Sequence, residues 1–168
     1  KGVESRVVGE SDKMKYLSCY DGWSVCGRGA GRVSGDELEP VWSGRNKDAN
    51  GARHTAFIKE ENMVGYGDDY VQSDVKHPMN FVADVIIEKG WKKKSVGVET
   101  DAYYYTARSD AQLKKSLGRD TLLDGNLIVN WVRLVKSDSE IELMNQAGKI
   151  TGHVMATSLS KLSPGVRA

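Results

Sequence analysis

The fold of this chain is decided by residues 130–144, which read NWVRLVKSDSEIELM. Within this segment Ser137 and Glu140 stand three positions apart before an apolar-periodic run, which is the spacing of a capping box at a helix start. We therefore expect a long helix that begins here and ends before Pro164. Its apolar side chains fall on one stripe: Ile141, Met144, Ala147, Ile150, Val154 and Met155. A stripe of this length favours packing back on the domain or dimerisation.

Strand and helix signals alternate along the rest of the chain. Runs rich in β-branched residues predict strands over residues 5–8, 38–42, 63–66 and 95–99, with a glycine-rich hairpin within 22–35. Residues 127–129 are expected to form a buried strand or an extended segment. Helical spacing predicts helices over residues 11–17, 50–58, 78–89 and 109–117. This alternation predicts an α/β domain, a mixed β-sheet flanked by helices.

Local signals mark several helix ends. Ser11 is placed to cap the first helix, and Ser109 with Gln112 has the spacing of a capping box. Pro78 suits a first helical turn, and Gly90 suits the position just past a helix end.

Composition excludes several classes of function. The 168 residues carry 24 basic and 23 acidic side chains, which leaves no charge excess for nucleic acid or an anionic membrane surface. No window approaches the roughly 20 apolar residues of a membrane span. Cys19 and Cys26 do not make a disulfide framework, so we expect free thiols, although a pairing across the short loop stays open. A cytoplasmic location is the expectation.

Six upstream blocks carry a resemblance to a known family. They read YDGWS at 20–24, PVWSGR at 40–45, DANGAR at 48–53, YVQS at 70–73, HPM at 77–79 and GVETDAYY at 97–104. Together with the Arg-x-x-Lys-Ser-x-x-Glu-Ile run at 133–141, they resemble the creatinase/prolidase family, known as pita-bread metallohydrolases. The run alone would indicate only this broad family, and the upstream blocks point to its ectoine hydrolase branch, which opens the cyclic amidine ectoine.

The resemblance implies that this chain is the N-terminal part of a longer, two-domain enzyme. Residues 1–131 would be the N-terminal domain, and residues 132–168 the linker and first long helix of a truncated catalytic domain. In this family the metal ligands follow that helix, so this chain alone is expected to be inactive and to bind no cofactor, while the intact enzyme would use Mn, Co or Zn. The alternatives are the N-terminal domain of an Xaa-Pro aminopeptidase, dipeptidase or creatinase, and a catalytically inactive binding module.

The resemblance also implies contacts made in trans. In creatinase-like homodimers the loop after the first block reaches the partner's active site, and the matching residues here are Trp23, Arg28 and Asp21. An arginine can hold a carboxylate by two hydrogen bonds, and an aromatic face suits a cationic ring. The alternative is that Trp23 packs in the core and Arg28 is a solvated loop charge. A homodimer with a small-molecule or dipeptide substrate is expected only for the intact enzyme.

Three further residues are candidates for a pocket or an interface: His77, Tyr103 and His153. The histidines of the chain are far apart and have no second ligand at short spacing, so the sequence predicts no metal site. The glycine-rich run at 27–32 lacks the spacing of a phosphate-binding loop. Neither cysteine lies beside a credible base, so no nucleophile is predicted.

Overall fold

The computed structural model describes residues 3–22, 30–32 and 40–165. By its contacts the chain divides into two compact units, Lys1–Ile128 and Val129–Ala168, and each is described here by itself. The predicted division into domains at 131/132 stays a prediction.

The first unit holds a parallel sheet of three short strands. Strand β1 (Ser5–Val7) pairs with β5 (Val96–Val98), and β5 pairs with β6 (Leu123–Asp124). In register, Val7 lies beside Val98 and Val98 lies beside Asp124. All three strands therefore end at one edge, and the residues that follow them come together there.

A second three-stranded sheet is mixed. Strand β3 (Val41–Arg45) lies in its middle, antiparallel to β2 (Ala30–Arg32) and parallel to β4 (Met63–Tyr66). Strand β4 lies where the sequence predicts it, whereas β3 begins three residues later than expected. Of the predicted hairpin within 22–35 the structure describes only Gly22 and residues 30–32, since residues 23–29 and 33–39 lie outside the described residues.

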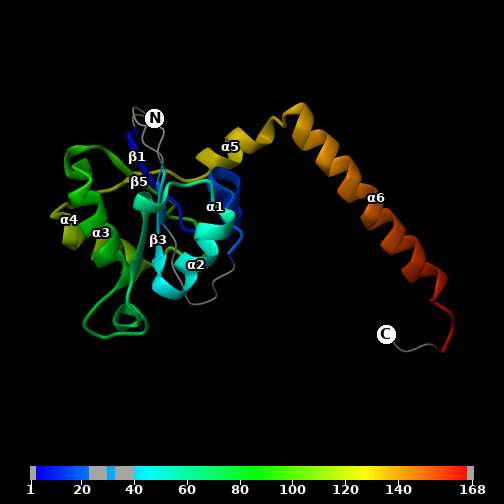
Figure 1. Ribbon diagram of the computed structural model, residues 1–168, viewed down its shortest axis with the longest axis horizontal. Helices are drawn as coiled ribbons and strands as arrows, with labels where there is room; N and C mark the ends of the chain where they lie inside the picture. Colours follow the sequence, from blue (N-terminus) through cyan, green and yellow to red (C-terminus); the bar gives the residue numbers. More distant parts are fainter. Residues whose placement is uncertain (1–2, 23–29, 33–39, 166–168) are drawn as a thin grey trace. The chain divides into compact units, whose positions relative to one another are not determined.

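Helices cover the strands on two sides (Figure 1). Helices α3 (Pro78–Glu88) and α4 (Ala107–Leu117) lie on one side, while α1 (Ser11–Ser18) and α2 (Asn46–Thr55) lie on the other. Three short 3-10 helices join them: η1 (Glu60–Asn62), η2 (Asp68–Tyr70) and η3 (Trp91–Lys93). The predicted α/β architecture, a mixed sheet flanked by helices, is confirmed.

The main core lies under α3 and α4, and both sheets contribute to it. Its buried members are Val7, Val41, Met79, Val82, Ala83, Val85, Ile86, Trp91, Val96, Val98, Leu113 and Leu117. Leu113 and Leu117 are completely buried. Burial of one such side chain stabilises the fold by about 1.5–3 kcal/mol. Since Val41 belongs to the mixed sheet and Val96 to the parallel sheet, this one core holds the two sheets in place.

Helix α3 begins as the sequence predicts, with Pro78 in its first turn. The cap is His77: its Nδ1 accepts a hydrogen bond from the backbone N–H of Met79, and its own N–H donates to Oδ1 of Asn80. Asn80 Nδ2 also donates to Oε1 of Gln112 and Oγ of Ser116. Asn80 thus both completes the cap of α3 and joins α3 to α4.

Some sequence-based expectations were wrong in detail. Ser11 is the first residue of α1 and not its cap, which is Glu10. The capping box of α4 joins Thr106 to Ser109, so Ser109 is its third helical residue and Gln112 takes no part. Helix α2 begins at Asn46, four residues before the expected start. A short polar segment carries few signals that separate one helix start from a neighbouring one.

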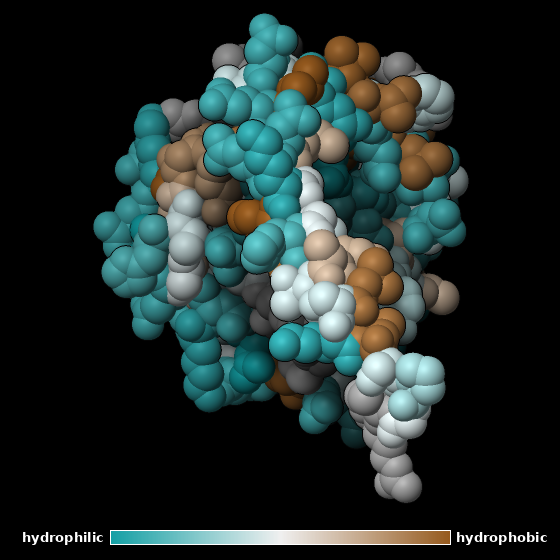
Figure 2. Space-filling view, turned by 90° about the vertical axis from the view of Figure 1, so that its right-hand side faces the viewer, coloured by the Kyte–Doolittle hydropathy of each residue, from teal (hydrophilic) through white to brown (hydrophobic). Residues whose placement is uncertain are grey.

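The second unit consists of helices. The strand or extended segment expected over 127–129 is not found there, since Leu127 has a positive φ of 58° and helix α5 (Ile128–Leu134) begins directly after it. A short apolar run does not by itself distinguish a strand from a helix. The long helix α6 (Asp138–Ser160) is confirmed, with its Ser137–Glu140 capping box. Apolar side chains lie uncovered at the molecular surface beside hydrophilic ones (Figure 2).

Among the described residues, no helix is both long enough and apolar enough to cross a membrane.

The backbone conformations of two glycines can be tested with the same substitution. Gly90 has a φ of +73° and Gly51 lies inside α2, and a methyl group would meet nothing within 4 Å at either position. We expect Gly90→Ala to lower the free energy of unfolding by about 1–2 kcal/mol, because an L-residue is strained there. Gly51→Ala should raise it by roughly 0.5–1 kcal/mol, because alanine is the better helix former. Urea denaturation measures both, and an equal effect of the two changes would contradict the assigned backbone conformations.

Candidate functional site at the carboxyl edge of the parallel sheet

The carboxyl edge of the parallel sheet collects polar side chains from three separate parts of the chain. Glu10 follows β1, Glu99 follows β5, and Asp124 ends β6. Open α/β sheets commonly bind their ligands at this edge, because loops from neighbouring strands meet there. The edge is therefore a candidate functional site.

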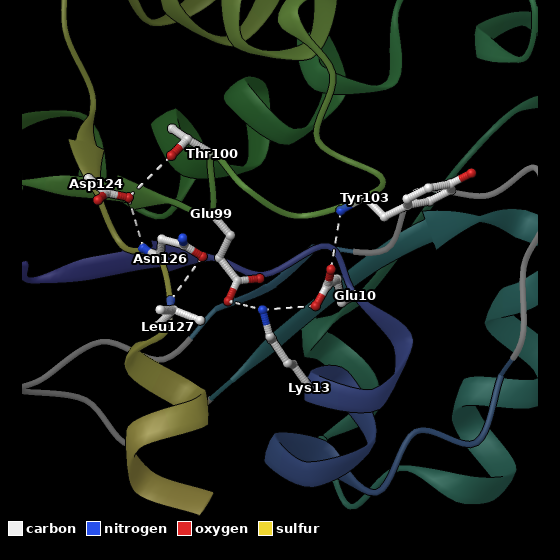
Figure 3. A network of polar contacts seen from close by, with 8 residues as sticks. All are labelled: Glu10, Lys13, Glu99, Thr100, Tyr103, Asp124, Asn126 and Leu127. Carbon is white, nitrogen blue, oxygen red and sulfur yellow. Dashed lines mark hydrogen bonds and ion pairs between the residues drawn. The ribbon is translucent and has the colours of Figure 1, made fainter.

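The centre of the edge is a lysine held between two carboxylates (Figure 3). Lys13, on α1, places its Nζ 2.8 Å from Oε2 of Glu10 and 3.0 Å from Oε1 of Glu99. The second contact is an ion pair by distance, although its angles are not those of a hydrogen bond. The side chains of Lys13 and Glu99 are only 4% and 1% exposed. Helix α1 is thus tied to the end of the central strand by a buried ion pair.

Burial and charge oppose each other within this cluster. Burial raises the pKa of the Glu99 carboxyl, and the ammonium of Lys13 partly offsets that rise. For Lys13, burial alone would lower the pKa, but its contacts with Glu10 and Glu99 outweigh burial and raise it. Burial also lowers the pKa of Arg6, on β1, against the opposing effect of the Glu99 charge. Lys13 therefore stays protonated, and its positive charge offsets part of the free-energy cost of burying an ionised carboxylate at Glu99.

The cluster also fixes the loop after β5. Oε1 of Glu10 accepts a hydrogen bond of 3.2 Å from the backbone N–H of Tyr103. Tyr103 is 86% exposed, and its ring stands edge-to-face against that of Tyr104, with ring centroids 5.4 Å apart. An exposed aromatic side chain is thus presented from a loop whose backbone is bound to a buried charge cluster.

A second polar group lies at the end of β6. Oδ1 of Asp124 accepts hydrogen bonds from Oγ1 of Thr100 at 3.3 Å and from the backbone N–H of Asn126 at 3.0 Å. Oδ1 of Asn126 accepts in turn from the N–H of Leu127 (Figure 3). These bonds shape the turn that leads from the sheet into α5, and they join it to the residue that follows Glu99.

The arrangement supports anchoring better than it supports chemistry. Lys13 cannot act as a base while two carboxylates hold its proton, because they favour the ammonium form. Among the described residues, no group of three histidine, cysteine, aspartate or glutamate side chains is placed to hold a metal ion. The residues of this edge therefore act by joining α1, β5 and the loop at Tyr103.

The residues predicted from sequence lie on different elements. Trp23 and Arg28 lie outside the described residues. Asp21 is exposed, its Oδ1 lies 2.6 Å from Nζ of Lys15, and its N–H donates to Oγ1 of Thr55. His77 caps α3, and among the predicted residues that the structure describes, Tyr103 is the one that contacts the charge cluster.

His153 lies on α6, is exposed, and belongs to a helix in which none of the residues is buried. The histidine cap and the exposed helix position give His77 and His153 ordinary structural surroundings. Their role in a pocket or interface stays a prediction.

Sequence reasoning missed the Lys13–Glu99 pair. The available signal was Glu99, which directly follows the Val-Gly-Val strand. Parallel sheets are usually covered on both faces, so a carboxylate at the end of such a strand is expected to be buried beside a partner. For Lys13 the sequence offered no comparable signal, since a lysine in a short polar helix is usually solvated. The pairing itself joins residues 86 positions apart and follows only from the fold.

Comparisons with known proteins agree with this fold. No protein-family model matches the chain. It is 38% identical over 167 residues to ectoine hydrolase from Halomonas elongata, covering 99% of this chain and 42% of that protein. It is 39% identical over 165 residues to an uncharacterized hydrolase/peptidase from Sinorhizobium fredii, covering 98% of this chain and 42% of the relative.

Solved structures of the same class superpose well. An X-Pro aminopeptidase from Thermotoga maritima matches 98% of this chain and 43% of its own with a TM-score of 0.72 at 14% identity. The prolidase from Pyrococcus horikoshii matches 98% of this chain and 40% of its own with a TM-score of 0.70 at 13% identity.

The fold and the relatives together place this chain with the N-terminal domain of creatinase/prolidase-type hydrolases, as its sequence predicts. Within that class its sequence relatives include ectoine hydrolase. The chain spans less than half the length of the relatives it matches.

Two lysines of α1 test the role of the buried pair. Lys13→Met should lower the free energy of unfolding by about 3–5 kcal/mol, because it leaves Glu99 buried without its partner. Lys15→Met removes a similarly short ion pair to Asp21, whose side chains are 62% and 63% exposed. That change should cost at most about 1 kcal/mol.

Chemical denaturation of both variants measures the difference. Equal stabilities of the two variants would contradict the view that the Lys13–Glu99 pair holds α1 to the sheet.

Proposed function

We propose that this chain is the non-catalytic N-terminal domain of a metal-dependent hydrolase that resembles ectoine hydrolase and cleaves C–N bonds. Its contribution would be dimer formation and contacts to the substrate in the partner's pocket, in the cytoplasm. The observation that carries the proposal is the 38% identity to ectoine hydrolase over 99% of this chain. The charge cluster also supports the proposal, because its contacts hold structural elements together and leave the reaction to other residues.

The intact enzyme would use divalent Mn, Co or Zn, the metals implied by its class. The described residues of this chain do not fit such a role, since they bring no three suitable ligands together. No reaction step is therefore assigned to them. The chain's own contribution in this proposal is to bind and orient the substrate through Arg28 and Trp23, with Asp21 nearby.

One relative favours a second candidate. The S. fredii protein, 39% identical over 165 residues, carries the name hydrolase/peptidase. A peptidase that cleaves next to proline would use the same domain as a scaffold with a different substrate. The two candidates differ in the substrate that is turned over, so one assay separates them.

A chimeric enzyme tests the proposal. This chain would replace the matched 42% of the H. elongata ectoine hydrolase, and ectoine, creatine and an Xaa-Pro dipeptide would be offered with each metal. We expect chelator-sensitive opening of ectoine by the chimera and none by the 168-residue chain alone. Turnover of the dipeptide alone would favour the peptidase, and a folded, metal-loaded chimera that acts on none of the three would refute the proposal.

Arg28 gives the sharper form of this test. Loss of a two-point hydrogen bond to a carboxylate costs about 1.5–3 kcal/mol, so Arg28→Ala in the chimera should lower kcat/KM roughly 10- to 100-fold. Lys93→Ala, at an exposed position of η3, is the matched control and should leave kcat/KM unchanged. An unchanged kcat/KM for Arg28→Ala would remove Arg28 from the substrate contacts.

A further inference from the structure

The short segment that joins α1 to Asp21 is held at several points. Ser18 ends α1, and its Oγ accepts a hydrogen bond of 3.4 Å from the N–H of Tyr20. Between them Cys19 turns the chain with a φ of 60°. Tyr20 is 4% exposed, and its ring packs on that of Trp42 in β3 with centroids 5.4 Å apart. The chain therefore reaches Asp21 through a turn that is hydrogen bonded and buried.

The end of α2 holds the backbone of Asp21 itself. The N–H of Asp21 donates to Oγ1 of Thr55, 34 positions along the chain, at 3.1 Å. Thr55 is the last residue of α2, and its hydroxyl donates to the carbonyl of Gly51 at 2.9 Å. Because a hydroxyl has one hydrogen, this bond leaves its oxygen lone pairs to the N–H of Asp21. A second tie lies beside it, since the N–H of Phe57 donates to the carbonyl of Ser18 at 3.1 Å.

The side chain of Asp21 is open to a ligand. It is 63% exposed, and its Oδ1 lies 2.6 Å from Nζ of Lys15. In the part of the chain that the structure describes, its Oδ2 has no hydrogen bond or ion pair. An exposed ion pair of this kind is weak, so a cationic ligand can displace the lysine. Asp21 thus combines a fixed backbone with a carboxylate that can accept N–H bonds from a cation.

We propose that Thr55 is a positioning residue, whose hydroxyl holds Asp21 where its carboxylate contacts the cationic group of the substrate. The inference rests on the proposed function, which puts Asp21 near the substrate, and it adds the role of Asp21 and the residue that holds it. The cationic group would be the amidine of ectoine, or the terminal amine of a peptide under the second candidate function. All of these contacts lie within the first unit.

Two variants of Thr55 in the chimera test the proposal. Thr55→Val keeps the shape of the side chain and removes the hydroxyl. It should raise KM for the substrate that the chimera hydrolyses roughly 3- to 10-fold, as expected for one lost hydrogen bond between neutral groups. The value of kcat should stay within about twofold, because no reacting group changes. Thr55→Ser restores the hydroxyl and should return KM to that of the unchanged chimera.

A double-mutant cycle separates positioning from a general loss of stability. Asp21→Asn removes the charge and should raise KM roughly 10-fold or more, because hydrogen bonds to charged groups are the stronger ones. Adding Thr55→Val to Asp21→Asn should then change KM less than about twofold, since the contact that Thr55 positions is already lost. A purely structural effect of Thr55 would add in full to that of Asp21, and this outcome would overturn the proposal. So would an unchanged KM for Asp21→Asn.

Hydrogen exchange of the 168-residue chain checks the bond without any substrate. Thr55→Val should speed exchange of the Asp21 amide, and Thr55→Ser should not; an unchanged rate for Thr55→Val would overturn the proposal. Thr55 and Asp21 are both exposed, so the variants should fold, and circular dichroism verifies this.

The kinetic results distinguish this inference from the proposed function. An unmoved KM for Thr55→Val, in a chimera whose kcat/KM falls with Arg28→Ala, would overturn this inference alone. A folded, metal-loaded chimera that hydrolyses none of the three substrates would refute the proposed function, and this inference with it.

Discussion

The buried ion pair between Lys13 and Glu99 is the interaction on which the arrangement of the N-terminal unit depends most. It joins α1 to the end of the central parallel strand, and through Glu10 it also holds the backbone of the loop at Tyr103. A buried carboxylate is costly unless a cation lies beside it, so the three elements must keep their positions together. The pair is therefore a constraint on geometry at least as much as a source of stability.

This constraint suits a scaffold. At the carboxyl edge of the parallel sheet, Lys13 forms ion pairs with Glu10 and Glu99, and Asp124 accepts hydrogen bonds from Thr100 and Asn126. A reactive centre instead keeps groups free to bind a substrate or to exchange protons near neutral pH. The edge thus supports the proposed role, in which this domain shapes a pocket whose chemistry comes from other residues.

The sequence predicted the architecture better than the site. The helix of residues 78–88 and the long helix after Ser137 could be predicted because each carries both apolar periodicity and a cap or proline signal. The strand expected over 127–129 is a helix start, because three apolar residues fit either structure. The Lys13–Glu99 pair could not be predicted, since its partners meet only through the pairing of β1 with β5. Trp23 and Arg28 were predicted as substrate contacts from the family resemblance alone.

We propose that this chain supplies scaffold and substrate contacts but no reaction centre. Isothermal titration of the 168-residue chain with Mn²⁺, Co²⁺ and Zn²⁺, followed by an ectoine hydrolysis assay on the same samples, tests that claim most directly. We expect no stoichiometric metal binding and no ring-opening with any of the three ions. Binding of one or two ions per chain, together with metal-dependent opening of ectoine, would contradict it.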